Sequence, residues 1–415
     1  MSTPYEHIFL KKEYHMNTRK IFGCGAHYLL SGVLAVIFAL ALSACDDGSE
    51  TDDTHTTGTK PGSGATPPGG TSKDDAIPLT ANQWADGNIT TSGGEQWFTF
   101  TATASTQYLH FDPTHSLSNV YVWVYDSGGA EVESEEYLYS SNTSTSRTLT
   151  NGQTYYIKVW PSPSSFGSDS GAYRIAFNTS IIPPGITPIP LTVNQWADGN
   201  ITTSGGEQWF TFTATASTQY LHFDHGTLAV LTVQVYDSGG AEVESKEYLY
   251  ISFSTPTSKT LTSGQTYYIK VWPSPSSFGS DSGAYRIAFN TTTTAPPVEL
   301  PTDAITLTAN QWADGNIPSS GGNQWFTFTA TASTQYLLHF DPTHSLSRVY
   351  VWVYDSGGAE VASKEYLYSS NTSTSRTLTN GQTYYIRVRP YYSGGDGSTG
   401  AYRIGFNTST TAPTS

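Results

Sequence analysis

Cysteine is nearly absent from this chain, which has only Cys24 and Cys45 among its 415 residues. Both lie near the N-terminus, so everything that follows Cys45 contains no thiol. The part of the chain after Cys45 therefore cannot form disulfide bridges or metal sites with cysteine ligands. Its domains must be held together by the burial of apolar cores.

Basic residues are also few, because 19 Lys plus Arg stand against 34 Asp plus Glu. Residues 1–44 hold four of the basic and two of the acidic residues, so the remainder carries 15 and 32, a formal net charge of −17. Such a protein is repelled by phosphate backbones and by anionic headgroups. We therefore expect no nucleic acid partner, and any membrane attachment must come from lipid rather than from a basic patch.

The sequence has one long apolar run, Tyr28–Leu42, and Arg19 and Lys20 precede it. Basic, apolar and small residues in this order predict a secretory signal peptide over residues 1–44, the only long helix that we expect. The run is too short to span a membrane comfortably. Met16 is a plausible start of translation, because the residues before it add nothing that a signal peptide needs.

The leader ends in Leu42-Ser43-Ala44-Cys45, which resembles the lipobox of bacterial lipoproteins. The resemblance implies that Cys45 becomes the lipidated first residue of the exported chain and can carry palmitate. The alternative is a signal anchor with an incidental cysteine. Residues 45–75 are rich in Thr, Gly, Ser, Pro and Asp, so this segment, with the lipidated cysteine at its start, is predicted to be a disordered, flexible tether.

Three near-identical stretches fill the rest of the chain. The string NQWADGNI begins at Asn82, Asn194 and Asn310, and each copy closes on GAYRI. We assign the copies to residues 76–179, 187–291 and 303–408, with Pro-containing links between them and a tail at 409–415. A period of this size indicates a repeated domain rather than a solenoid unit. The copies leave no room for a separate catalytic domain.

Within each copy the pattern is that of short β-strands. In the first copy, Gln96–Ala102, Val120–Tyr125 and Tyr155–Val159 alternate in a period of two and are rich in aromatic and β-branched residues. Asp-Ser-Gly-Gly and Asn-Gly stretches between such segments are typical of hairpins. We expect eight or nine strands per copy, and hence an all-β chain of three tandem antiparallel β-sandwiches of jelly-roll type.

The order of these motifs resembles the bacterial pre-peptidase C-terminal domain. In the first copy they are QWFTF from Gln96, VYVWVYDSGGAEV from Val120, TLTNGQTYYIKV from Thr148 and GAYRIAF from Gly171. The resemblance extends over all three copies and implies a β-sandwich appended to secreted enzymes, which aids secretion or binds matrix or substrate. The peptidase that usually accompanies this module is absent, so the resemblance implies no enzymatic activity here.

Two kinds of residue could suggest catalysis. Asp126-Ser127-Gly128-Gly129 is similar to the serine motif of trypsin-like proteases, but it follows an alternating strand in all three copies, where a tight turn explains Asp and Gly. His110, His222 and His339 recur as His-Phe-Asp without a carboxylate motif beside them. We expect these histidines to be structural or solvated.

The carboxylates give only weak support for two-carboxylate catalysis or for a metal site. The acidic positions Glu131, Glu133, Glu135 and Glu136 are only partly kept in the third copy, where Ala362 and Lys364 replace the second and third, so a solvated strand face is the better interpretation. Loop carboxylates that could contribute to a calcium site are Asp86, Asp126 and Asp169, but no Asp-x-Asp-x-Asp-Gly spacing occurs. We predict no metal site and no cofactor, and calcium binding stays open.

Aromatic residues on one face of the strands are the better candidates for binding. If the valines of Val120–Tyr125 face the core, the residues between them stand outside, where rings can stack on sugars or anchor a protein. The second copy keeps the apolar set but has Thr232 and Gln234 between, as expected of an outward face. The alternative is a ring ladder that only stabilises the sheet. The candidate ligand-binding residues are Tyr121, Trp123, Tyr125, Trp160, Trp272, Tyr350, Trp352 and Tyr354.

These observations predict a lipid-anchored protein of the bacterial cell envelope, on the outer membrane, the cell surface or a periplasmic face. Its three non-catalytic modules would bind polysaccharide or extracellular protein, with affinity raised by the repetition of the modules. The alternative is a structural spacer without a discrete ligand. An enzyme is the third hypothesis and the one that the repeats favour least.

Overall fold

The computed structural model describes residues 69–414 except 141, 163–168, 204, 227, 229, 251–255, 275–281, 319–321, 332–334 and 392–398. The predicted signal peptide, Cys45 and most of the tether lie outside the described residues. The chain divides into two units, residues 1–63 and residues 64–415, and the second contains all three repeats. Among the described residues, no helix is long and apolar enough to cross a membrane.

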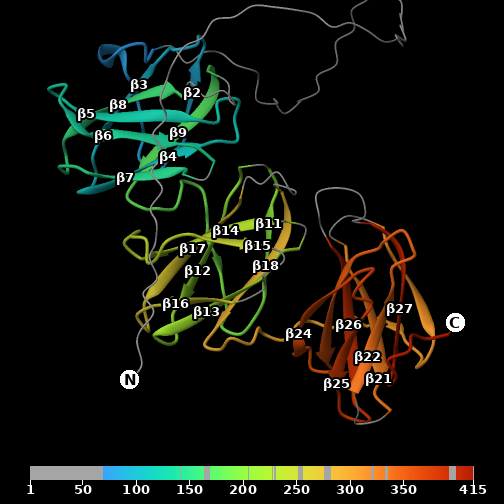
Figure 1. The fold of residues 1–415 in the computed structure, drawn as a ribbon. Helices are drawn as coiled ribbons and strands as arrows, with labels where there is room; N and C mark the ends of the chain where they lie inside the picture. The colour runs from blue at the N-terminus through green and yellow to red at the C-terminus, as the bar shows by residue number, and fades with distance from the viewer. Residues whose placement is uncertain are drawn as a thin grey trace, which may run out of the picture. The chain divides into compact units, whose positions relative to one another are not determined.

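Alternating residues in repeat 1 build two facing sheets (Figure 1), because each strand places one side on a shared core. A short 3-10 helix, η1 (Lys73–Asp75), precedes them. The strands are β1 (Ile77–Pro78), β2 (Ala85–Ile89), β3 (Gln96–Thr101), β4 (Thr106–Asp112), β5 (Val120–Asp126), β6 (Glu131–Leu138), β7 (Ser144–Thr148), β8 (Thr154–Pro161) and β9 (Gly171–Asn178).

The strand order of repeat 1 is that of a jelly roll. One sheet runs β1-β3-β8-β5-β6 and the other β2-β9-β4-β7, so consecutive strands mostly lie in different sheets. All pairings are antiparallel except that of β1 with β3, where Ile77 lies beside Phe98. The predicted antiparallel β-sandwich is confirmed, with this one short parallel pair added.

Repeats 2 and 3 have the same nine-strand plan and the same sheet orders. In repeat 2 the strands are β10 (Ile189–Pro190), β11 (Ala197–Ile201), β12 (Gln208–Thr213), β13 (Thr218–Asp224), β14 (Val230–Asp237), β15 (Glu247–Tyr250), β16 (Thr257–Thr260), β17 (Thr266–Pro273) and β18 (Gly283–Asn290). In repeat 3 they are β19 (Ile305–Thr306), β20 (Trp312–Ile317), β21 (Gln324–Thr329), β22 (Gln335–Asp341), β23 (Val349–Asp355), β24 (Glu360–Leu367), β25 (Ser373–Thr377), β26 (Thr383–Pro390) and β27 (Gly400–Asn407).

Each repeat has its own apolar core between its two sheets. In repeat 1, Val120, Val122 and Val124 are fully buried, together with Phe98 and Ile157 from the neighbouring strands. The alternating residues of β5 point away from this core. The assignment of sides made from the valine pattern is therefore confirmed.

Candidate binding surfaces

The Asp-Ser-Gly-Gly motif is a hairpin turn between β5 and β6. The amide of Gly129 donates to the carbonyl of Asp126 at 3.1 Å, and the amide of Ala130 donates to the Asp126 carboxylate at 2.9 Å. Gly129 has a φ of 88°, a left-handed conformation that glycine adopts without steric cost. The carboxylate therefore serves the turn, as the sequence predicted, and the same bonds recur at Asp237 and Asp355.

The recurring histidines are buried and fasten the segment that follows the last strand. His110 Nε2 lies 2.9 Å from Asn178 Oδ1 and 3.1 Å from the carbonyl of Ser180, so this nitrogen carries the proton. Its Nδ1 lies 2.8 Å from the hydroxyl of Ser144. Burial lowers the pKa of His110 from 6.5 to about 4. His222 and His339 make the same bond to an asparagine, which fits a structural role.

The candidate metal ligands are dispersed. Asp86 pairs with Arg174 at 3.2 Å, Asp126 holds the turn, and Asp169 lies 3.5 Å from the hydroxyl of Ser92. Glu133 lies 3.6 Å from the guanidinium of Arg147. Within the part of the chain that the structure describes, no group of three or more His, Cys, Asp or Glu is placed to hold a metal ion.

The outer side of the five-stranded sheet in repeat 1 carries a connected set of rings around one cation, which we call the aromatic face of repeat 1. Its residues are Trp97, Tyr121, Trp123, Tyr125, Lys158 and Trp160. Ring centroids lie 5.4 Å apart for Trp97 and Tyr125, 6.0 Å for Tyr121 and Trp123, and 6.0 Å for Trp123 and Trp160. The Trp160 side chain is 37% exposed and the others are half-buried. Four of the predicted binding residues thus gather on one accessible face.

Lys158 lies at the centre of this face. Its ammonium lies 5.0 Å from the Trp123 ring centroid and 6.0 Å from that of Trp97, within the range of cation–π attraction. Glu95 forms an ion pair with Lys158 at 3.1 Å and accepts a hydrogen bond from the indole of Trp97 at 2.8 Å. The indole bond, with help from Lys158, lowers the pKa of Glu95. Neither Trp97 nor Lys158 was among the residues predicted to bind a ligand, although Trp97 recurs in both later copies and Lys158 recurs as Lys270.

The equivalent face of repeat 2 is covered by repeat 1, which corrects the prediction for Trp272. That side chain is only 3% exposed, and Trp209 and Tyr236 beside it are 1% and 9% exposed. Trp209 and Tyr236 form an apolar cluster with Tyr108 of repeat 1 and Ile181 of the link. The Tyr108 hydroxyl also donates to the carbonyl of Gly239 at 2.9 Å.

A buried polar group completes this junction between repeats 1 and 2. Lys270 donates to the hydroxyl of Thr143 at 2.5 Å and pairs with Glu207 at 2.6 Å, while Thr143 donates to Glu207 at 2.7 Å. Burial opposes the charge of Glu207, but Lys270 outweighs it, so the pKa of Glu207 lies below its ordinary value. Thr143 and Lys270 are 3% and 4% exposed, so this polar group is buried.

In repeat 3 the predicted face is also largely covered, because Tyr350 and Tyr354 are 5% and 4% exposed. Arg387 and Arg389 from β26 donate to the carboxylate of Asp224, on β13 of repeat 2, at 2.7 Å and 2.8 Å. Tyr350 is further enclosed by the rings of its own repeat, Tyr366 and Tyr391. The expectation that Tyr350 and Tyr354 stand open to a ligand is therefore corrected, and Trp352 stays half-buried.

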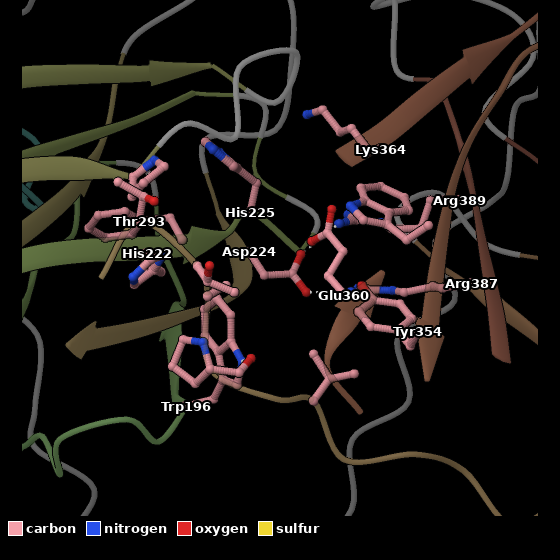
Figure 2. A pocket seen from close by; sticks show the side chains of 17 residues that line it. Trp196, His222, Asp224, His225, Thr293, Tyr354, Glu360, Lys364, Arg387 and Arg389 are labelled. Atoms are coloured by element: carbon pink, nitrogen blue, oxygen red, sulfur yellow. Dashed lines mark hydrogen bonds and ion pairs between the residues drawn. The ribbon is translucent and has the colours of Figure 1, made fainter. Parts of the chain in front are cut away.

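A cavity of about 310 Å³ lies beside this ion pair (Figure 2). Two tryptophans, Trp196 and Trp352, line it together with charged groups. Burial raises the pKa of Glu360 to about 7 and lowers that of Lys364 to about 8. The Asp224 carboxylate faces the two arginines there, with which it is hydrogen-bonded. The carboxylate beside the cavity, that of Asp224, is therefore already paired with two arginines.

The comparisons with known proteins concern the fold. No family model matches the sequence, and no curated protein matches it. The chain is similar to the pre-peptidase C-terminal domain of collagenase from Bacillus anthracis, with 13% identity over 26% of this chain and 99% of that one, at a TM-score of 0.21. It is similar to the CUB1-EGF-CUB2 domains of rat MASP-1, with 8% identity over 80% and 99% of the two chains and a TM-score of 0.18. Tandem CBM51 modules of a family 98 glycoside hydrolase from Streptococcus pneumoniae match with 9% identity over 50% and 82%, at a TM-score of 0.16. One similar structure is thus a domain of the family that the motifs resemble, and at these scores none of the likenesses assigns a function.

Proposed function

We propose that the chain is a non-catalytic binding protein of the bacterial cell envelope and that the aromatic face of repeat 1 holds an extracellular macromolecule. The observation that carries this proposal is the connected set of rings around Lys158, ending in the exposed Trp160. Tyr and Trp rings stack on sugar rings and anchor protein partners. An open sheet face suits a polysaccharide or a protein surface better than a small metabolite, which needs a concave pocket.

Attachment to the envelope is supported by the sequence around Cys45, through which lipid would hold the exported chain. The acidic tether would keep the repeats away from the bilayer. Incorporation of labelled palmitate tests this part of the proposal. Label should enter the wild-type chain and be lost in Cys45→Ala, and label that persists in the variant would overturn the anchor.

Binding is tested with a lipid-free form of the chain, residues 46–415, on peptidoglycan, chitin, cellulose and collagen. We expect retention on one of these supports and a loss of about tenfold or more in affinity for Trp123→Ala, because a central ring of a stacking face is removed. Tyr248→Ala is the matched control, since Tyr248 is an aromatic residue of repeat 2 that is 49% exposed. Equal losses in the two variants would contradict the proposal.

A structural spacer is the second candidate. It is favoured by one observation, the covered aromatic faces of repeats 2 and 3, which hold the repeats to one another rather than to a ligand. A chain that binds no support and no partner, while folding normally, would favour this second function.

A further inference from the structure

The contact between repeats 1 and 2 joins two surfaces that recur along the chain. One is the aromatic face of the later repeat, with Trp209, Tyr236 and Lys270. The other is the outer side of the four-stranded sheet of the earlier repeat, with Tyr108 from β4 and Thr143 just before β7, which we call the docking face. Such a contact between different surfaces of like units is heterologous, and it does not close on itself after one step.

The first and the last repeat each leave one of these surfaces uncovered. Trp160 on the aromatic face of repeat 1 is 37% exposed, whereas its counterpart Trp272 is 3% exposed. On the docking face, Thr143 of repeat 1 is buried, whereas its counterpart in repeat 3, Thr372, is exposed. The difference lies in coverage and not in sequence, because the residue types are identical at both positions.

The uncovered aromatic face repeats the residues that the junction between repeats 1 and 2 uses, and the uncovered docking face repeats a part of them. On the aromatic side, the residues that match Glu207, Trp209, Tyr236, Lys270 and Trp272 are Glu95, Trp97, Tyr125, Lys158 and Trp160. On the docking side, Thr372 matches Thr143, whereas Leu337 takes the register position of Tyr108, because Leu337 pairs with Asn407 as Tyr108 pairs with Asn178. Thr410 stands where the link between repeats 1 and 2 has Ile181. The ion pair between Lys158 and Glu95 is already formed at 3.1 Å, as Lys270 and Glu207 are paired in the covered junction.

The chain's own tether is a poor occupant for the aromatic face. Residues 46–68 contain no Phe, Tyr, Trp, Leu, Ile or Val with which to cover the rings. The described segment before β1 bonds at two places, where the carbonyl of Gly70 accepts from the amide of Trp97 at 2.7 Å and where Lys73 lies 4.7 Å from the Tyr156 ring centroid and donates to the carbonyl of Ser127. Trp123 and Trp160 stay accessible beside it.

We propose that the aromatic face of repeat 1 binds the docking face of repeat 3 in a second copy of this chain. Thr372 would then take the place that Thr143 has between Lys270 and Glu207, now between Lys158 and Glu95. The contact repeats in one direction, so copies associate head to tail into open chains. The inference rests on the proposed function, because both use the aromatic face of repeat 1. It specifies the binding partner as a second copy of this chain.

Sedimentation velocity of residues 46–415 at increasing concentration tests the proposal. The sedimentation coefficient should grow with concentration beyond that of a dimer. Trp160→Ala removes a ring of one surface, and Thr372→Arg places a bulky cation on the other. Each should raise the apparent dissociation constant at least about tenfold. Thr377→Arg is the matched control, because its counterpart Thr148 stays exposed in repeat 1.

A mixture of the two variants distinguishes head-to-tail association from other kinds. The Trp160→Ala chain keeps an intact docking face and the Thr372→Arg chain keeps an intact aromatic face, so together they should form a dimer that does not grow. Chains that stay monomeric at every concentration, variants that associate as the wild type does, or a mixture that stays monomeric would each overturn the inference. Thr372→Arg leaves repeat 1 intact, so its retention on the polysaccharide and collagen supports tests the proposed function separately.

Discussion

At the scale of single residues, the recurring histidines show how a group with catalytic potential is used for structure. His110 donates from Nε2 to Asn178 and accepts at Nδ1 from Ser144, so both nitrogens are occupied when the ring is neutral. A second proton would displace the bond from Ser144 and place a charge in a buried site. Glu207 favours that charge and Lys270 opposes it, but burial outweighs both.

This arrangement predicts an acid-sensitive repeat 1. The pKa of His110 falls from 6.5 to about 4 on folding, so the unfolded chain binds a proton between these values that the folded chain does not. The contribution of His110 to stability is therefore complete above pH 6.5 and declines by about 3 kcal/mol as the pH falls to 4. Proton NMR of the imidazole should give a midpoint near pH 4. His110→Gln should flatten the pH dependence of the unfolding temperature over this interval, and an unchanged slope would contradict the account.

At the scale of strands, the sequence predicts which side of a strand faces its own core but not what covers the other side. Val122 and Val233 are buried in their cores, as the period of two requires. Trp160 and Trp272 occupy the same position in identical strands, yet one is 37% and the other 3% exposed. The signal that marks the difference lies in the neighbouring repeat, at Tyr108 and Thr143, and no pattern within one copy could reveal it. Repeat 3 has Arg389 where repeats 1 and 2 have Trp, and this residue is a partner of Asp224 in the neighbouring repeat.

A second prediction concerns the Gly in the NQWADGNI string, which β2 places over a ring of β9. A Cβ added at Gly87 would lie 2.3 Å from the Tyr173 ring, and the same approach recurs at Gly199 and Gly315. Gly87→Ala should therefore destabilise repeat 1 by about 1–3 kcal/mol through overpacking. Gly152→Ala is the comparison, because its Cβ would meet nothing within 4 Å and only its φ of +80° is strained. Thermal unfolding of the two variants measures the difference, and an equal or smaller loss for Gly87→Ala would contradict it.

At the scale of the whole molecule, the two junctions use the same faces with different chemistry. Between repeats 1 and 2, Lys270 forms an ion pair with Glu207 of its own repeat and donates a hydrogen bond to the neutral hydroxyl of Thr143. Between repeats 2 and 3, the charges lie on opposite sides, with Arg387 and Arg389 facing Asp224. The second junction therefore depends more strongly on a single ionised group.

Asp224→Asn should consequently weaken the association of repeats 2 and 3. It leaves Arg387 and Arg389, which are buried, without the carboxylate that pairs with them, at a cost of about 3–5 kcal/mol. Calorimetry should show repeat 3 unfolding at a lower temperature, and proteolysis should cut the link at residues 292–301 sooner.

Asp112→Asn is the matched control, because this carboxylate in the same His-Phe-Asp motif bonds only to Thr114 and His115 nearby. Burial raises and the two arginines lower the pKa of Asp224, with a net decrease, so the wild-type junction is complete at neutral pH and is lost only as acid protonates this group. Asp224→Asn should therefore remove a part of the acid sensitivity that Asp112→Asn retains, and if both variants unfold as the wild type does, the ion pair does not hold the junction.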